Sequence, residues 1–176
     1  KEERTFSAAD RIVAEVKNRT QAAGKIILFG HSAGGQFVHR WALLGGRKNV
    51  DVIAVANSGW FTMPDRDIDY PYGIKNVGIT DEELGEAFAK PVILFMGEKD
   101  VERKPPFRDT PEADAQGMNR MERCTNYFRQ CKAKAEELRV PFRWKLETVE
   151  GAAHQGVKMA EGAAAYIFGK SSEDRN

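Results

Sequence analysis

The sequence predicts an α/β protein in which a parallel sheet carries helices on both faces. Short, continuous apolar runs alternate along the chain with longer stretches whose apolar residues recur at helical spacing. Continuous apolar runs are typical of strands covered on both sides, and alternation of strands with helices is typical of parallel sheets. The 176 residues show neither an internal repeat nor a linker, so we expect one domain over residues 1–176.

Each expected helix has a start signal in the sequence. Ser7, with an acid three residues later, predicts the start of the first helix. The capping-box pattern at 80–83 predicts a short helix, and Thr110 followed by proline predicts one long helix that continues to Leu138. Further helices are expected at about 33–44 and 156–168, and strands at 26–29, 50–56, 91–96 and 142–149.

Composition excludes several classes of protein. The 27 Lys and Arg nearly balance the 26 Asp and Glu, and no basic stretch alternates with aromatic residues, so nucleic-acid binding is not indicated. Apolar runs such as 52–56 and 92–96 are far shorter than the roughly 20 residues of a membrane-spanning helix. Cys124 and Cys131 are separated by roughly 10 Å of helical rise, so both are expected to be free thiols. The three histidines form no cluster with cysteine that suggests a structural zinc site.

The segment 30–34, GHSAG, joins the first expected strand to a helix and fits the pattern G-x-S-x-G. A serine on so sharp a turn adopts strained backbone dihedral angles, and Gly30 and Gly34 are expected to relieve the crowding around it. The turn exposes the hydroxyl group and aims the backbone N–H of Ala33 at an oxyanion that forms beside it. Ser32 is therefore the candidate nucleophile, and an incidental serine in a glycine-rich turn is the alternative.

A serine hydroxyl needs a base to accept its proton, and the chain has three histidines. His31 adjoins Ser32 and is expected to point elsewhere, while His39 lies about 10 Å further along the helix. His154 follows the fourth expected strand, at the edge where the carboxyl ends of parallel strands meet. His154 is therefore the candidate base, with a lone surface histidine as the alternative.

The base needs a carboxylate that fixes its tautomer, and the segment after the third expected strand offers two. Asp100 is the first candidate, because a turn at Gly97 can aim its short side chain at the site. Glu98 is the second candidate, and a solvated charged loop is the alternative interpretation.

Along the chain the candidates occur in the order Ser32, Asp100, His154. In this order, and in the stretches ANSGWFTMPD, YPYG and GEKD, the sequence resembles the α/β-hydrolase superfamily. Within that superfamily it is similar to esterases related to polyhydroxyalkanoate depolymerases, over about the C-terminal two-thirds of the fold. The resemblance implies hydrolysis of a small-molecule or polymeric ester through an acyl-enzyme on Ser32, with His154 as base and then acid and Asp100 orienting it. No cofactor is implied. Trp60 becomes a candidate wall of the substrate pocket, and a buried core tryptophan is the alternative.

The sequence also departs from this family. Such folds begin with several strands before the nucleophile strand, and a loop among those strands supplies a second oxyanion donor. Only 25 residues precede Ile26, and no HGGG-type stretch occurs. We therefore expect a missing N-terminal segment of the same fold to be a partner of these residues. The segment 60–78, which has aromatic residues but no regular period, is expected to form a lid.

Other functions remain compatible with the same residues. A peptidase or a thioesterase uses the same kind of triad as an esterase. A non-catalytic, hydrolase-like binding module keeps the fold but does not react with serine-directed phosphonates.

Overall fold

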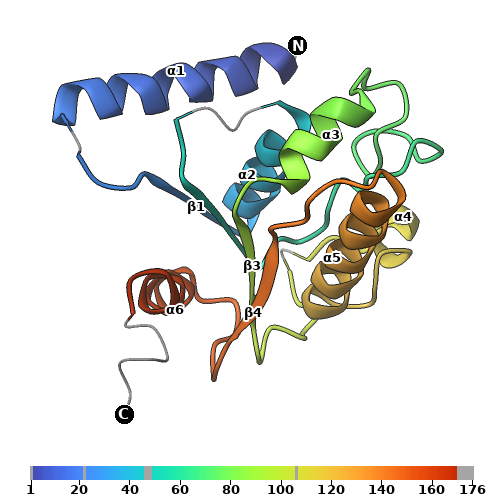
Figure 1. The fold of residues 1–176 in the computed structure, drawn as a ribbon. Coiled ribbons are helices and arrows are strands. Elements are labelled where there is room, and N and C mark those ends of the chain that lie inside the picture. The colour runs from blue at the N-terminus through green and yellow to red at the C-terminus, as the bar shows by residue number, and fades with distance from the viewer. Residues whose placement is uncertain (1, 22, 46–48, 106, 170–176) are drawn as a thin grey trace.

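The computed structural model describes residues 2–21, 23–45, 49–105 and 107–169 (Figure 1). In this part of the chain four strands form one parallel sheet in the order β1-β2-β3-β4. The strands are β1 (Ile27–His31), β2 (Val52–Ala56), β3 (Val92–Gly97) and β4 (Lys145–Val149). The helices are α1 (Glu2–Thr20), α2 (Ala33–Leu44), α3 (Asp81–Phe88), α4 (Pro111–Asp114), α5 (Arg120–Glu137) and α6 (Gly156–Phe168).

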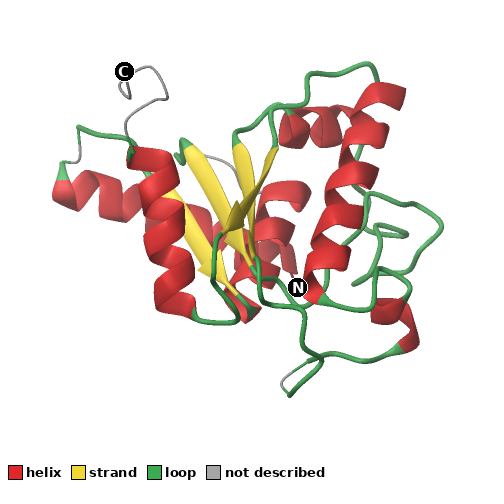
Figure 2. Ribbon diagram, turned by 90° about the horizontal axis from the view of Figure 1, so that it is seen from below, coloured by secondary structure: helices red, strands yellow, loops and turns green. Residues whose placement is uncertain are grey.

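Helices cover both faces of the sheet, which confirms the predicted fold class (Figures 1 and 2). Side chains of α2, α3 and α5 form the main core on one face, together with residues such as Val55 and Leu94 of the central strands. On the other face α6 packs through Met159 and Ala163 against a smaller cluster that includes Phe95. The two central strands are thus buried on both sides, which explains their continuous apolar runs.

The register of the strands brings their carboxyl ends to one edge of the sheet. His31 of β1 pairs with Ala56 of β2, and Gly97 of β3 pairs with Val149 of β4. The residues that follow each strand therefore leave the sheet side by side, where a parallel sheet gathers its chemistry.

Two helices differ from the predictions. The first, α1, begins at Glu2, so that Ser7 lies inside it; Phe6 packs against Phe37 of α2 with ring centroids 5.7 Å apart, which holds the early turns in place. The long helix predicted after Thr110 is divided into α4 and α5, because Gly117 adopts a φ of 144° and Asn119 caps the new start. The predicted capping box at 80–83 is confirmed.

The two cysteines lie on α5, and both are free and buried. Burial raises the pKa of the Cys124 and Cys131 thiols well above the ordinary value. None of the helices in the described ranges is long and apolar enough to cross a bilayer.

His39 is a fully buried side chain of α2 that connects the main core to the segment after β2. Its Nε2 accepts a hydrogen bond of 3.0 Å from the backbone N–H of Thr62, so the proton sits on Nδ1, which donates to the carbonyl oxygen of Gly35. Burial, with a smaller contribution from the charge of Arg40, lowers the pKa of His39 to about 3. The ring is neutral in the folded protein.

This histidine makes folding stability depend on pH. The unfolded chain protonates His39 near the ordinary pKa of 6.5, whereas the folded chain does so only near 3, so stability is lost as the pH falls from 6.5 toward 3. We expect a loss of about 1 kcal/mol between pH 7 and 5.5 from this residue. Urea unfolding followed by tryptophan fluorescence measures it, and His39→Gln should flatten the pH dependence by that amount. An equal pH dependence in both proteins would contradict the assignment, because all other titrating groups are common to them.

Candidate active site

Ser32 lies on the sharp turn between β1 and α2. Its φ of 56° and ψ of −116° fall outside the regions that non-glycine residues ordinarily adopt, which is a strain typical of functional sites. Two backbone hydrogen bonds hold the turn: the N–H of Ser32 donates to the carbonyl of Ala56, and its carbonyl accepts from the N–H of Gln36. The strained conformation is therefore fixed by both β2 and α2.

Glycines permit this turn at two positions. A Cβ atom on Gly30 would lie 2.5 Å from the carbonyl oxygen of Gly34, and one on Gly35 would lie 2.6 Å from the Oγ of Ser58. Gly34 differs from the prediction, because a Cβ atom there would meet nothing within 4 Å. The crowding is thus relieved at Gly30 and Gly35, where α2 passes close to the ends of β1 and β2.

The structure brings together Ser32, His154 and Asp100. The Oγ of Ser32 lies 3.0 Å from the Nε2 of His154, and the Nδ1 of His154 lies 2.7 Å from the Oδ2 of Asp100. The second distance implies that Nδ1 carries the proton and donates to the carboxylate, which leaves Nε2 free to accept the proton of the serine hydroxyl. Three side chains that follow three different strands thus form one continuous hydrogen-bonded chain.

Asp100 is held from its other side by a buried arginine. The Nη1 of Arg120, at the start of α5, donates to its Oδ1 at 3.1 Å, and the two side chains are 5% and 4% exposed. The guanidinium thus gives the buried carboxyl group of Asp100 a hydrogen-bonded partner of opposite charge. Glu98, the second candidate, instead accepts a hydrogen bond from the backbone N–H of Gly151, at the start of the loop that carries His154.

Asn57 connects the ends of β2 and β3 to the loop of His154. Its side-chain oxygen accepts from the N–H of Gly97 at 2.7 Å, and its side-chain nitrogen donates to the carbonyl of Ala153 at 3.0 Å. Asn57 itself has a φ of 46°, which asparagine tolerates better than most residues. It therefore positions His154 through the residue that precedes it.

His31 packs against the candidate base. Its ring centroid lies 4.7 Å from that of His154, and the space for it exists because Gly156 has no side chain. Burial, followed by the proximity of His154, lowers the pKa of His31. As predicted, His31 does not contact the serine hydroxyl; it forms a neutral wall beside the His154 ring.

Ala33 opens α2 directly after Ser32. The N–H groups of the first helical turn have no acceptor within the helix, so the N–H of Ala33 is available to an oxyanion beside the serine. No group of three metal-ligating side chains occurs in the described part of the chain.

Trp60 follows β2 in a segment whose backbone is buried yet irregular. The guanidinium of Arg123, fully buried, donates to the carbonyl of Gly59 at 2.6 Å, and the side chain of Gln116 forms two hydrogen bonds with the backbone of Phe61. Trp60 is 7% exposed and belongs to a small cluster apart from the main core, in which its ring contacts that of Tyr72. Its role as a wall of the substrate pocket stays a prediction, and the core alternative stays open.

The segment 60–78 packs into the main core on both sides of its exposed tip. Phe61, Met63 and Ile74 are buried in the main core, whereas its tip at 66–69 is exposed. The lid function expected of this segment stays a prediction, and Arg66 in the tip bonds to the carbonyl of Ile79 and to Asp81.

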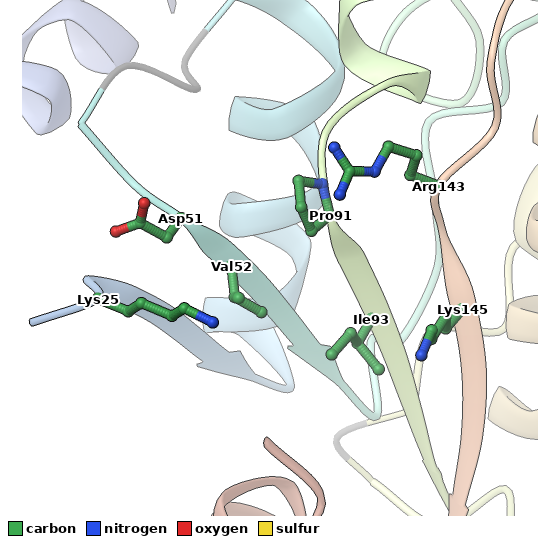
Figure 3. Close-up of a pocket in the computed structure, with 7 residues that line it drawn as sticks. All are labelled: Lys25, Asp51, Val52, Pro91, Ile93, Arg143 and Lys145. Carbon is green, nitrogen blue, oxygen red and sulfur yellow. The ribbon is translucent and has the colours of Figure 1, made fainter. Parts of the chain in front are cut away.

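Two hollows lie at opposite ends of the sheet. One, of about 280 Å³, opens beside Asp100, Arg120 and His154. The other, of about 570 Å³, lies among residues that lead into the strands, such as Lys25 and Pro91, and does not reach the candidate site (Figure 3).

Solved structures resemble this chain over nearly its whole length. Poly(aspartic acid) hydrolase-1 from Sphingomonas sp. KT-1 is 32% identical, with a TM-score of 0.86 over 93% of this chain and 62% of its own. LpqC, a poly(3-hydroxybutyrate) depolymerase from Bordetella parapertussis, is 30% identical, with a TM-score of 0.85 over 97% of this chain and 59% of its own. TT1662 from Thermus thermophilus, 16% identical with a TM-score of 0.51 over 93% of this chain and 60% of its own, shares the fold alone.

The chain thus spans about three fifths of the length of these proteins. No family model and no curated protein matches its sequence. The chain has the α/β-hydrolase fold. Within that fold it resembles depolymerase-like esterases, which confirms the resemblance inferred from the motifs.

The hydrogen bonds of Asn57 generate a prediction. Asn57→Gly removes the hydrogen bonds to Ala153 and Gly97 but leaves the backbone free to adopt a positive φ. Because the loop of His154 is then held less firmly, we expect Ser32 to react about tenfold more slowly with a fluorophosphonate. The rate is measured by intact-protein mass spectrometry.

Asn57→Ala serves as the companion variant. It loses the same bridge and adds backbone strain, so its free energy of unfolding should fall by about 1 kcal/mol more than that of Asn57→Gly. If Asn57→Gly reacts at the rate of the parent chain, the bridge does not position His154.

Proposed function

We propose that this chain carries the catalytic machinery of a serine hydrolase that cleaves carboxylic esters. The observation that supports it is the continuous chain of hydrogen bonds from Ser32 through His154 to Asp100, built on a strained turn at the carboxyl edge of the sheet. A hydroxyl group at the end of such a series of hydrogen bonds is activated as a nucleophile, because an acceptor for its proton is in place.

In the proposed mechanism the Ser32 oxygen attacks the carbonyl carbon of the substrate while the Nε2 of His154 takes the hydroxyl proton. Asp100 stabilises the resulting imidazolium, and the N–H of Ala33 donates to the oxyanion of the tetrahedral intermediate. His154 then gives the proton to the departing alcohol, which leaves an acyl group on Ser32. A water molecule, deprotonated by His154, hydrolyses this acyl-enzyme and restores the serine.

The substrate is proposed to be a small-molecule or polymeric ester, with Trp60 as part of the pocket wall. The two most identical structures described above are a poly(aspartic acid) hydrolase and a poly(3-hydroxybutyrate) depolymerase, which supports a polymeric substrate. A peptidase or a thioesterase is the alternative on the same triad, and comparison of turnover with matched ester, amide and thioester substrates distinguishes them.

A fluorophosphonate probe tests the proposal. We expect one covalent adduct on Ser32, located by mass spectrometry of the digested protein, because an activated serine attacks phosphorus as it attacks a carbonyl. Replacement of His154 by Gln should slow labelling by at least about 100-fold, since it removes the proton acceptor.

Ser32→Ala and Ser58→Ala form a matched pair of variants. Ser58 also follows a strand at the carboxyl edge and is buried, but no base lies against it. Labelling should disappear in Ser32→Ala and persist in Ser58→Ala. An adduct on Ser58 would overturn the assignment of Ser32 as the nucleophile, and no adduct on the folded chain would favour the binding-module alternative.

A further inference from the structure

A cluster of basic and aromatic side chains near the candidate nucleophile has no part in the mechanism above. The guanidinium carbons of Arg40 and Arg108 lie 5.0 Å and 5.7 Å from the centroid of the Trp60 ring, and the ring of Tyr72 lies 4.9 Å from it. These four residues, the arginine–aromatic cluster, come from α2, from the segment before α4 and from the segment after β2.

The cluster lies along α2 from the serine. Gln36 and Arg40 are four residues apart on α2, so they share one face of the helix, and Ser32 lies on the turn directly before this helix, about 12 Å from Arg40 along the axis. The segment that carries Trp60 runs against this face, because a Cβ atom on Gly59 would lie 2.9 Å from the side-chain nitrogen of Gln36. A substrate that reaches beyond the reacting carbonyl along this face meets the cluster.

Neutral groups hold both arginines in place. The Nε of Arg108 donates to the hydroxyl of Tyr72 at 2.7 Å, and the hydroxyl of Tyr72 lies 2.9 Å from the Oγ1 of Thr110. The Nε of Arg40 donates to the carbonyl of Gln36 at 2.7 Å. These bonds orient the guanidinium groups without neutralising their charge.

Neither arginine of the cluster forms an ion pair in the described part of the chain. Among the residues that the structure describes, no carboxylate forms an ion pair with Arg40 or Arg108, whereas Arg103, Arg120 and Arg123 each pair with an aspartate. Glu112 interacts with Arg108 only through space, since its own side chain bonds to Thr110. Two like charges gathered on one aromatic ring raise the local potential for an anion.

We propose that the arginine–aromatic cluster binds a carboxylate of the substrate, on a unit beyond the bond that Ser32 attacks. Guanidinium groups match carboxylates in shape and charge, and Arg108 is exposed, so that a ligand in solution can reach it. The inference rests on the proposed function, because it assigns the cluster to the substrate of Ser32. A cluster with this role would favour a substrate that carries several carboxylates over a neutral polyester.

The test measures binding of N-acetyl tetra-aspartate and N-acetyl tetra-asparagine to the Ser32→Ala chain by isothermal titration calorimetry. The two peptides have similar shape and differ in charge. We expect tetra-aspartate to bind at least about tenfold more tightly. Arg108→Gln and Arg40→Gln should each weaken binding of tetra-aspartate by about tenfold and leave that of tetra-asparagine unchanged.

Arg129→Gln is the matched control, because Arg129 is an exposed arginine on α5 outside the cluster. It should leave both affinities unchanged, which excludes a general effect of net charge. Arg108 is exposed, so its variant is expected to fold even if that of the half-buried Arg40 does not. Equal affinity for the two peptides, or equal effects of Arg108→Gln and Arg129→Gln, would overturn the inference.

The result is separable from the test of the proposed function. Labelling of Ser32 without discrimination between the two peptides overturns the carboxylate site alone. Arginine-dependent binding of tetra-aspartate in a chain whose Ser32 does not react with the fluorophosphonate overturns the hydrolase proposal and leaves an anion-binding module.

Discussion

The buried backbone that follows β2 constrains the whole carboxyl edge of the sheet. Residues 58–62 belong to no strand or helix, yet they lie in the interior, where each unpaired N–H or carbonyl group costs free energy. Side chains from distant parts of the chain supply the missing hydrogen bonds. His39 bonds to the backbone of Thr62, Gln116 to that of Phe61, and Arg123 to that of Gly59. Helices α2 and α5 are thereby connected across this segment, and the position of Trp60 follows from their packing.

The same edge assembles the candidate site from residues far apart in sequence. Ser32 and His154 are 122 residues apart; the parallel register puts the ends of their strands on one edge of the sheet, and the loop after β4 carries His154 past the ends of β3 and β2 to Ser32. Because the fold already holds these groups in a fixed orientation, no further entropy is lost in bringing them together for the reaction. The ion pair between Asp100 and Arg120 extends this fixation, because a carboxylate held at both oxygens has little freedom to turn.

Features with a local cause were predictable from the sequence. The central strands, α2 and α3 carry their signals in neighbouring residues, and the rule that loops at strand ends hold the chemistry selected Ser32, Asp100 and His154. The division of the long helix at Gly117 was missed because Thr110 and Pro111 signal a start and nothing nearby requires a stop except one glycine. Asn57 and Arg120 were missed for a different reason: each acts through a partner at least 20 residues away, which no periodicity reveals.

The two cysteines of α5 have a practical consequence. Both thiols are buried, and burial raises the pKa of each, so little of the reactive thiolate exists at neutral pH. A cysteine introduced at an exposed position, such as Asp67 at the tip of the segment 60–78, would react with maleimide or spin-label reagents ahead of the two native ones. The chain with both native cysteines in place can therefore carry a spectroscopic probe at that tip without prior removal of Cys124 and Cys131.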